Sequence, residues 1–134
     1  ICFIGDGELQ EGTIIETLNF ITAFPSIDLK IILDYNGFAD STPFDSDYFF
    51  NVRKSLCALF GNRMHQLSIR NRESLHSLQL MASLPGLQFI SCQLPKGLGS
   101  PITQGDPGRW HAGIPKDQSE LSQILESIDY TDFS

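Results

Sequence analysis

Residues 1–7, Ile-Cys-Phe-Ile-Gly-Asp-Gly, join an apolar run to an aspartate that lies between two glycines. The run Ile1–Ile4 stops at turn-forming residues, as a buried strand does. Apolar residues then recur near the 3.6-residue period of a helix as far as Pro25, and Glu11 falls in the expected first turn. A second apolar, β-branched run, Leu29–Leu33, ends in Asp-Tyr-Asn-Gly at 34–37. This pattern predicts a strand, a helix and a second strand.

The rest of the chain continues the alternation of strands and helices. We expect a surface loop from Ala39 to Asp47, because this stretch is rich in Asp, Ser and Pro. The later expected elements are helices at 48–60, 73–84 and 118–128, strands at 64–69 and 87–94, and a long Gly/Pro segment at 95–115. Alternating strands and helices predict an α/β fold, a three-layer sandwich with a mostly parallel sheet covered on both sides.

Composition narrows the class of protein. The chain has 134 residues, 41% of them hydrophobic, which suits a single domain over residues 1–134. Sixteen acidic residues against nine basic ones give a net charge of −7, so we expect no nucleic-acid or membrane partner. Three widely spaced cysteines favour reduced thiols in a cytoplasmic protein. The chain begins inside an apolar run without a Met, so we expect the domain to be truncated at its N-terminus.

Two oxygen-rich turns follow the first two expected strands. In a parallel sheet, ligands bind at the carboxyl ends of the strands, where Asp6 and Asn36 both fall. A carboxylate and an amide oxygen are ligands that Mg²⁺ accepts beside phosphate oxygens and water. The turn glycines and the helix N-terminus would offer N–H groups to a diphosphate. The sequence thus predicts a metal–diphosphate site at this edge.

Simpler interpretations of these turns remain open. Asp6 could merely cap the helix, and Asn36-Gly37 could be an ordinary turn. A dinucleotide-binding turn fits less well, because Gly5, Gly7 and Gly12 do not have the G-x-G-x-x-G spacing, and Asp6 would repel a bare diphosphate. No G-K-[ST] sequence for a P-loop is present.

Longer motifs resemble one family. Gly-Asp-Gly-Glu-Leu-Gln-Glu-Gly at 5–12, followed by Asn36, closely resembles the thiamine-diphosphate motif of transketolases, which begins with GDG and ends in Asn about thirty residues later. Lys-Gly-Leu-Gly at 96–99 is similar to the family's K-G-K-G, and Trp-His-Ala-Gly-Ile-Pro at 110–115 to its W-H-G-x-x-P. The resemblance touches most of the chain and implies a partial thiamine-diphosphate-binding fold.

The resemblance implies roles for particular residues. It places Mg²⁺, or Ca²⁺ or Mn²⁺ in its place, on Asp6, Asn36 and the Phe38 carbonyl. It also implies that Gly5 and Gly7 approach the diphosphate, with the Gly7 N–H contacting it. His111 matches a catalytic histidine near the diphosphate and the reacting carbonyl, although it could instead be a structural loop residue beside Trp110.

Further implications concern assembly. Glu11 and Glu16 match positions that link cofactor sites across a subunit interface. Taken alone, Glu11 is also a favourable first-turn carboxylate and Glu16 a solvated helix residue. The family also requires a C-terminal transketolase domain or subunit, in a dimer or heterotetramer, which carries the glutamate that activates the aminopyrimidine. We find no candidate for that glutamate in this chain.

The chain departs from the family pattern in three places. The segment Phe38-Ala39-Asp40-Ser41 is one residue short and lacks an apolar side chain that would pack on the cofactor. Ser-Ile-Arg-Asn-Arg at 68–72 replaces the family's Asp-Gly-His-Asp, and Leu98 replaces the second lysine of K-G-K-G. Cofactor affinity and substrate range are the properties that these changes would affect.

The implied activity is transfer of a two-carbon ketol unit between sugars, from a ketose to an aldehyde acceptor, with the cofactor supplying the carbanion chemistry. The implied substrates are sugar phosphates or related ketoses and aldoses. One alternative is another thiamine enzyme, such as a ketoacid dehydrogenase component or a deoxyxylulose phosphate synthase-like protein. The other is a non-catalytic remnant that keeps the fold and binds a partner, which the shortened loop would favour.

Overall fold

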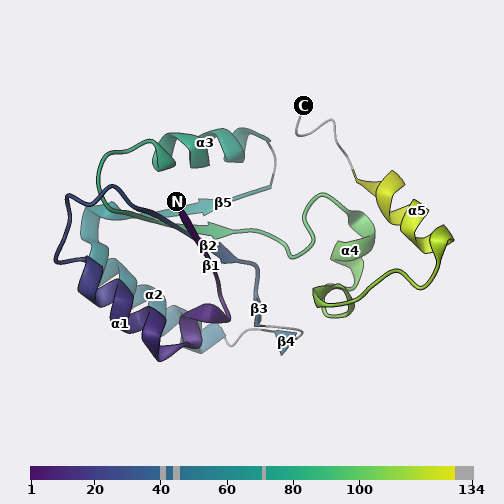
Figure 1. Cartoon of the computed structure of the whole chain (residues 1–134), viewed down its shortest axis with the longest axis horizontal. Coiled ribbons are helices and arrows are strands. Elements are labelled where there is room, and N and C mark those ends of the chain that lie inside the picture. The colour runs from purple at the N-terminus through teal and green to yellow at the C-terminus, as the bar shows by residue number, and fades with distance from the viewer. Residues whose placement is uncertain (40–41, 44–45, 71, 129–134) are drawn as a thin grey trace.

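A four-stranded sheet forms the centre of the computed structural model, which describes residues 1–39, 42–43, 46–70 and 72–128. All neighbouring strands are parallel, in the order β1-β2-β6-β5 (Figure 1). The strands are β1 (Cys2–Gly5), β2 (Lys30–Tyr35), β5 (Met64–Ser68) and β6 (Gln88–Gln93). The predicted α/β class and parallel sheet are therefore confirmed.

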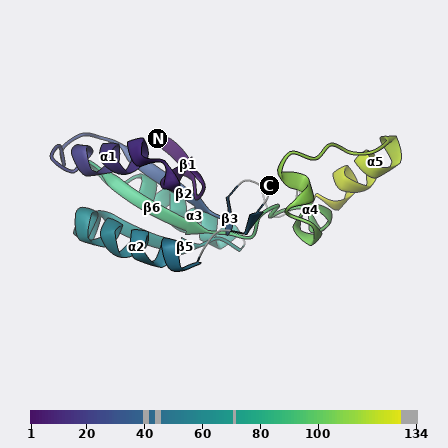
Figure 2. The ribbon, with the colours of Figure 1, turned by 90° about the horizontal axis from the view of Figure 1, so that it is seen from below.

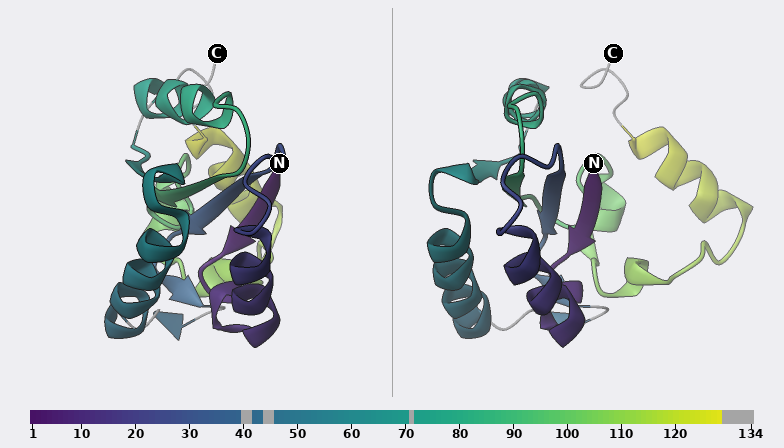
Figure 3. Two further views of the ribbon diagram at one scale, coloured as in Figure 1. Left: turned by 90° about the vertical axis from the view of Figure 1, so that its left-hand side faces the viewer. Right: turned by 60° about the vertical axis from the view of Figure 1, so that its left-hand side comes forward.

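Helices cover both faces of this sheet. Helices α1 (Gly12–Ile21) and α2 (Ser46–Phe60) lie on one side, and α3 (Arg72–Ala82) lies on the other (Figures 1 and 3). The arrangement is the three-layer sandwich expected from the sequence, and it matches part of a thiamine-diphosphate-binding fold.

Strand alternation divides the core in two. Ile31, Leu33 and Phe89 belong to the cluster that also contains Leu18 of α1 and Leu56 of α2. The intervening strand residues face the opposite way, because successive side chains of a strand point to opposite sides of the sheet. They form the cluster against α3, which contains Ile32, Ile69, Ile90 and Cys92.

The edge strand β1 is only half buried, which corrects the prediction of a buried strand. Ile4 is buried among the residues on the α1 side, whereas the Phe3 side chain is 69% exposed. The two residues alternate across the strand, and α3 packs on β5 and β6 rather than on β1. The apolar composition of the run correctly indicates a strand but does not distinguish a covered face from an uncovered one.

The expected loop from Ala39 to Asp47 also needs correction. A short antiparallel pair, β3 (Phe38–Ala39) and β4 (Thr42–Pro43), occupies part of it, and α2 already begins at Ser46. Asp40 and Ser41, on which the shortened-loop prediction depends, lie outside the described residues. Polar composition obscures so short a pairing, because a two-residue strand has no periodicity to detect.

The expected Gly/Pro segment after β6 contains two short helical elements, namely α4 (Pro101–Gly105) and a 3₁₀ helix at Arg109–His111. Helix α5 (Gln118–Ser127) follows, close to the predicted 118–128. Figures 1 and 2 show α4 and α5 beyond the sheet rather than over either face. Two further 3₁₀ helices lie at Glu8–Gln10 and Gly61–Arg63. Within the described ranges, no helix has the length and apolar character needed to cross a bilayer.

Candidate metal and diphosphate site

Asp6 connects the turns that follow β1 and β2. Its side chain is buried, with 1% of its surface exposed. Oδ2 accepts a hydrogen bond from the Gly37 N–H at 2.8 Å, and Oδ1 accepts one from the Gly7 N–H at 3.1 Å. The register that pairs Gly5 with Asp34 brings the two turns together. The interpretation of Asp6 as a mere helix cap is therefore wrong, because its carboxylate bridges two strand ends and does not cap α1.

Asn36 shapes the turn after β2. Its Oδ1 accepts a hydrogen bond from the Phe38 N–H at 3.1 Å, and its Nδ2 donates to Asp34 Oδ1 at 3.3 Å. Gly37 adopts φ of +84°, which a residue with a Cβ rarely adopts. The amide thus organises the turn, and the two predicted metal-binding side chains, Asp6 and Asn36, both hydrogen-bond to backbone N–H groups of residues 37–38.

The carboxyl groups of Asp6 and Asp34 lie in surroundings that disfavour their ionised form. Burial is the main reason that the pKa of Asp6 is raised, and the nearby Asp34 carboxylate raises it further, against backbone hydrogen bonds that lower it. Burial also raises the pKa of Asp34, while the Asn36 hydrogen bond and the Lys96 charge oppose that shift. A divalent cation beside Asp6 would stabilise the negative charge of these carboxylates.

The predicted site residues line one open cavity of about 650 Å³. The seven predicted residues found there are Gly5, Asp6, Gly7, Glu11, Asn36, Phe38 and His111. Glu8, Gln10 and Lys96 line it as well. Because these residues come from the ends of β1, β2 and β6 and from the 3₁₀ helix at 109–111, the fold brings together segments more than a hundred residues apart.

Lys96 and His111 form the basic part of this cavity. Lys96 Nζ lies 2.7 Å from His111 Nδ1 and 5.1 Å from the centre of the Phe38 ring. A lysine ammonium can only donate, so His111 Nδ1 accepts and the imidazole proton lies on Nε2. The His111 side chain is exposed. This pair provides positive charge and N–H donors to a cavity whose other charged residues, among those described, are Asp6, Glu8 and Glu11.

The acidic residues near the first turn have different surroundings. Glu8 Oε2 accepts a hydrogen bond from the Gly5 N–H at 2.6 Å, and this bond stabilises the turn between residues 5 and 8. Glu11 is exposed and stands at the N-cap position of α1, one residue before the first turn in which we expected it, and its side chain makes no capping bond. The Gly7 N–H, expected to contact the diphosphate, donates to Asp6 in this structure.

The donor set fits a hard divalent cation. Carboxylate and amide oxygens suit Mg²⁺ or Ca²⁺, whereas soft metals prefer thiolate and imidazole ligands. Among the described residues, no group of three or more His, Cys, Asp and Glu side chains could hold a metal alone. A cation here would need the Asn36 amide, backbone carbonyls and the oxygens of a ligand such as a diphosphate, in addition to Asp6.

Three residues near the site had not been predicted to take part in it. Lys96 belongs to the Lys-Gly motif, which could have indicated a role for this residue in the site. The motif does not predict its contact with His111. Asp34 directly precedes the Tyr-Asn-Gly turn. An aspartate at the end of a strand is common, so its position in the sequence does not indicate a site. The contact of Glu8 with Gly5 depends on the 3₁₀ helix at 8–10, which a helical period does not reveal.

An α/β protein with a parallel sheet, oxygen-bearing side chains and a Lys–His pair at the carboxyl edge of that sheet is consistent with part of a thiamine-diphosphate-binding fold. No protein-family model matches the chain. Transketolase from Pongo abelii is 33% identical to it over 132 residues, and human transketolase is 28% identical; each alignment covers 95% of this chain and 20% of the relative. Transketolase-like protein 1 from Macaca fascicularis is 25% identical over 96% of this chain and 22% of its own length.

These similarities confirm the resemblance to the transketolase family along nearly the whole chain. The chain spans about a fifth of the length of these curated relatives.

Proposed function

We propose that this chain supplies the metal and diphosphate part of a thiamine-diphosphate site in a transketolase-type enzyme. Its reaction is the transfer of a two-carbon ketol unit between sugar phosphates. The observation that carries this proposal is the single cavity in which Asp6 and Asn36 lie with Lys96 and His111. Similarity to transketolases supports the reaction class.

In this proposal Asp6, the Asn36 amide oxygen and the Phe38 carbonyl hold Mg²⁺, which Ca²⁺ or Mn²⁺ can replace. The cation lies between Asp6 and the diphosphate and turns their repulsion into coordination. Gly5 and Gly7 let the backbone approach the diphosphate, because neither carries a side chain. The raised pKa of Asp6 in the metal-free chain supports a role for this carboxylate as a ligand rather than as a structural charge.

The bound cofactor supplies carbanion chemistry. Lys96 holds His111 with its proton on Nε2, from which the imidazole donates to the diphosphate or to an oxygen on which negative charge develops. The Asp34 carboxylate is near enough to Lys96 for their opposite charges to interact.

We further propose that residues 1–134 act as one domain, in the cytoplasm, together with a C-terminal transketolase domain or subunit in a dimer or heterotetramer. Glu11, exposed at the rim of the cavity, would face that partner. The length of the relatives, about five times that of the matched segment, supports the need for further domains.

Phosphorus NMR of thiamine diphosphate tests the cofactor role. We expect the two phosphorus signals to shift and broaden when the chain is added with Mg²⁺, and the effect to disappear with EDTA. Thiamine, which has no phosphate, should compete only weakly with thiamine diphosphate when it is added in excess. An equal effect with and without the metal would contradict the proposal.

The ketol-transfer role is tested with the chain combined with a transketolase C-terminal domain. Two-carbon transfer from a ketose phosphate to an aldose phosphate is the expected activity, and His111→Gln should lower kcat by at least about tenfold. Decarboxylation of a 2-ketoacid without ketol transfer would assign the chain to another class of thiamine enzyme.

A further inference from the structure

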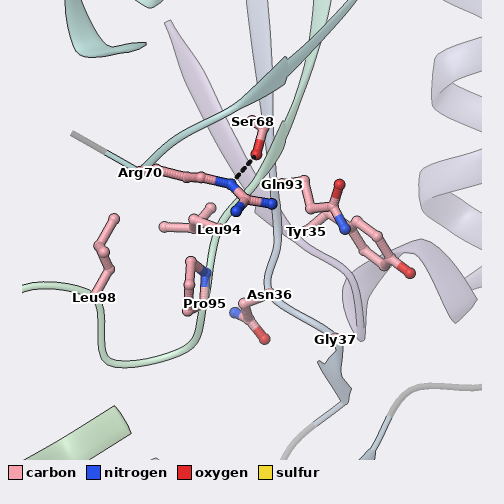
Figure 4. Close-up of a pocket in the computed structure, with 9 residues that line it drawn as sticks. All are labelled: Tyr35, Asn36, Gly37, Ser68, Arg70, Gln93, Leu94, Pro95 and Leu98. Carbon is pink, nitrogen blue, oxygen red and sulfur yellow. Dashed lines mark hydrogen bonds between the residues drawn. The ribbon is translucent and has the colours of Figure 1, made fainter. Parts of the chain in front are cut away.

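A second hollow lies at the carboxyl ends of β2, β5 and β6 and shares Asn36 as a lining residue with the first cavity. It has a volume of about 400 Å³ and contains the Arg70 side chain (Figure 4). A smaller cavity of about 240 Å³ adjoins it, shares Tyr35, Ser68 and Gln93 as walls, and contains Arg53 of α2. The two arginines therefore approach one region of the sheet edge from different elements.

The charge of this region is opposite to that of the chain. The protein has 16 acidic residues and 9 basic ones, yet no carboxylate is found among the described residues that line either cavity. Within the described ranges, neither Arg53 nor Arg70 forms an ion pair, in contrast to Arg109, whose Nη2 lies 2.8 Å from Glu120 Oε1. Two arginines without a carboxylate partner at one edge leave positive charge for a ligand.

Arg70 is fixed at its base. The N–H of the preceding residue, Ile69, donates to the Gln93 carbonyl at 2.8 Å, so the pairing of β5 with β6 extends to the residue before Arg70. Arg70 Nε donates to Ser68 Oγ at 3.2 Å, which holds the guanidinium over the hollow (Figure 4). In this view the terminal guanidinium nitrogens lie toward the Gln93 side chain, and Asn36 lines another part of the same hollow.

We propose that Arg70, with Arg53, forms a subsite for a phosphate group, carried by a phosphomonoester or present as free phosphate. A guanidinium matches the oxygens of a phosphate with two parallel N–H bonds. The Ser68 hydroxyl and the Gln93 amide add uncharged donors that suit a tetrahedral oxyanion. Because Asn36 lines both cavities, the subsite adjoins the proposed metal site, but phosphate binding there requires neither Mg²⁺ nor thiamine diphosphate.

The test is a titration of the ¹⁵N-labelled full chain, followed by NMR, without Mg²⁺ or thiamine diphosphate and at constant ionic strength. The ligands are inorganic phosphate, glycerol phosphate, glycerol and acetate. Both phosphates should shift the Arg70 Nε–H signal with a Kd on the order of 1 mM. The tighter of the two identifies the source of the phosphate group. Shifts of equal size with glycerol or acetate would overturn the proposal.

Three variants localise the binding. Arg70→Gln should weaken phosphate binding at least fivefold, and Arg53→Gln should weaken it less. Lys54→Gln is the matched control, because Lys54 is an exposed cation on α2 next to Arg53 that lines neither cavity, and it should bind as the wild type does. Equal losses in Arg70→Gln and Lys54→Gln would mean nonspecific attraction and would overturn the proposal. The wild-type Arg70 signal decides the question even if a variant fails to fold.

Discussion

Asp6 is a buried side chain for which we propose a metal-binding role in addition to its structural one. Its oxygens accept the N–H groups of Gly7 and Gly37, so it stabilises the contact between two strand ends. The same burial, together with the neighbouring Asp34, makes its negative charge unfavourable without a cation. A carboxylate with these two properties makes metal binding and local stability interdependent.

In the metal-free chain, the stability contributed by Asp34 should decrease as the pH rises. The pKa of Asp34 is raised above its ordinary 3.8, so its contribution to stability is complete below about that pH and is lost as pH rises through the raised value. Asp34→Asn removes this loss. In thermal unfolding without divalent cations, the variant should gain stability relative to wild type at pH 7.5 compared with pH 4.5. The same difference at both pH values would show that Asp34 is not charged unfavourably.

Cys92 gives a second prediction at the scale of one residue. Burial in β6 raises its pKa to about 11, and the Asp34 carboxylate adds to the shift. Because the thiolate is the reactive form, and at pH 8 only roughly 0.1% of such a thiol is ionised, Cys92 should resist alkylation in the folded chain. Mass spectrometry should show the exposed Cys2 and Cys57 modified first. Modification of all three at equal rates would contradict the position of β6.

The location of the candidate site could be predicted from the sequence, whereas most contacts within the site could not. Asp6 and Asn36 were predictable because turns that follow parallel strands converge at one edge. The contact of Lys96 with His111 was not, since it depends on how the chain between them turns back. In the sequence, Arg70 stands out only as a departure from the family pattern, because its location in a hollow depends on the positions of three strands.

At the scale of the elements, Gly97 determines how the segment after β6 packs next to Lys96. Gly97 has φ of +80°, and a Cβ added there would lie 2.7 Å from Thr103 Oγ1 and 2.9 Å from the Thr103 carbonyl carbon. Thr103 also donates a hydrogen bond from its hydroxyl to the Gly97 carbonyl at 3.1 Å. The glycine therefore allows α4 to pack directly against the residue that follows Lys96.

Gly97→Ala should lower the free energy of unfolding by about 2 kcal/mol or more, because it combines a left-handed backbone with a steric clash. Gly105→Ala is the control, since a Cβ there meets nothing within 4 Å, and it should change stability by less than about 0.5 kcal/mol. Chemical denaturation measures both. Equal effects of the two substitutions would contradict the described packing of α4.

Element types were predictable where a period or an apolar run was long enough to detect. The 118–128 prediction came within one residue of α5, because its apolar positions repeat at the helical period and Asp117 accepts the Glu120 N–H as an N-cap. The β3–β4 pair and α4 were missed, since elements of two to five residues are stabilised by their neighbours rather than by their own pattern.

In the whole molecule, the proposed sites lie at the carboxyl edge of the sheet. The proposed oxygen ligands follow β1 and β2, the Lys–His pair follows β6, and the two arginines line the cavities beside β5. Sequence predicted the three layers because strands alternated with helices along the chain. It could not predict the order β1-β2-β6-β5, since that order depends on which strands the helices bring side by side.

Calorimetric titration of Mg²⁺ and thiamine diphosphate into the full chain tests the central claim most directly. We predict metal-dependent binding by the wild type, a loss of at least about tenfold in affinity for Asp6→Asn, and no change for Glu126→Ala, which removes an exposed carboxylate far along the chain. Circular dichroism would verify that the variants are folded. Absence of metal-dependent binding by the wild type, or equal affinity in Asp6→Asn, would contradict the claim that Asp6 and Asn36 form a metal–diphosphate site.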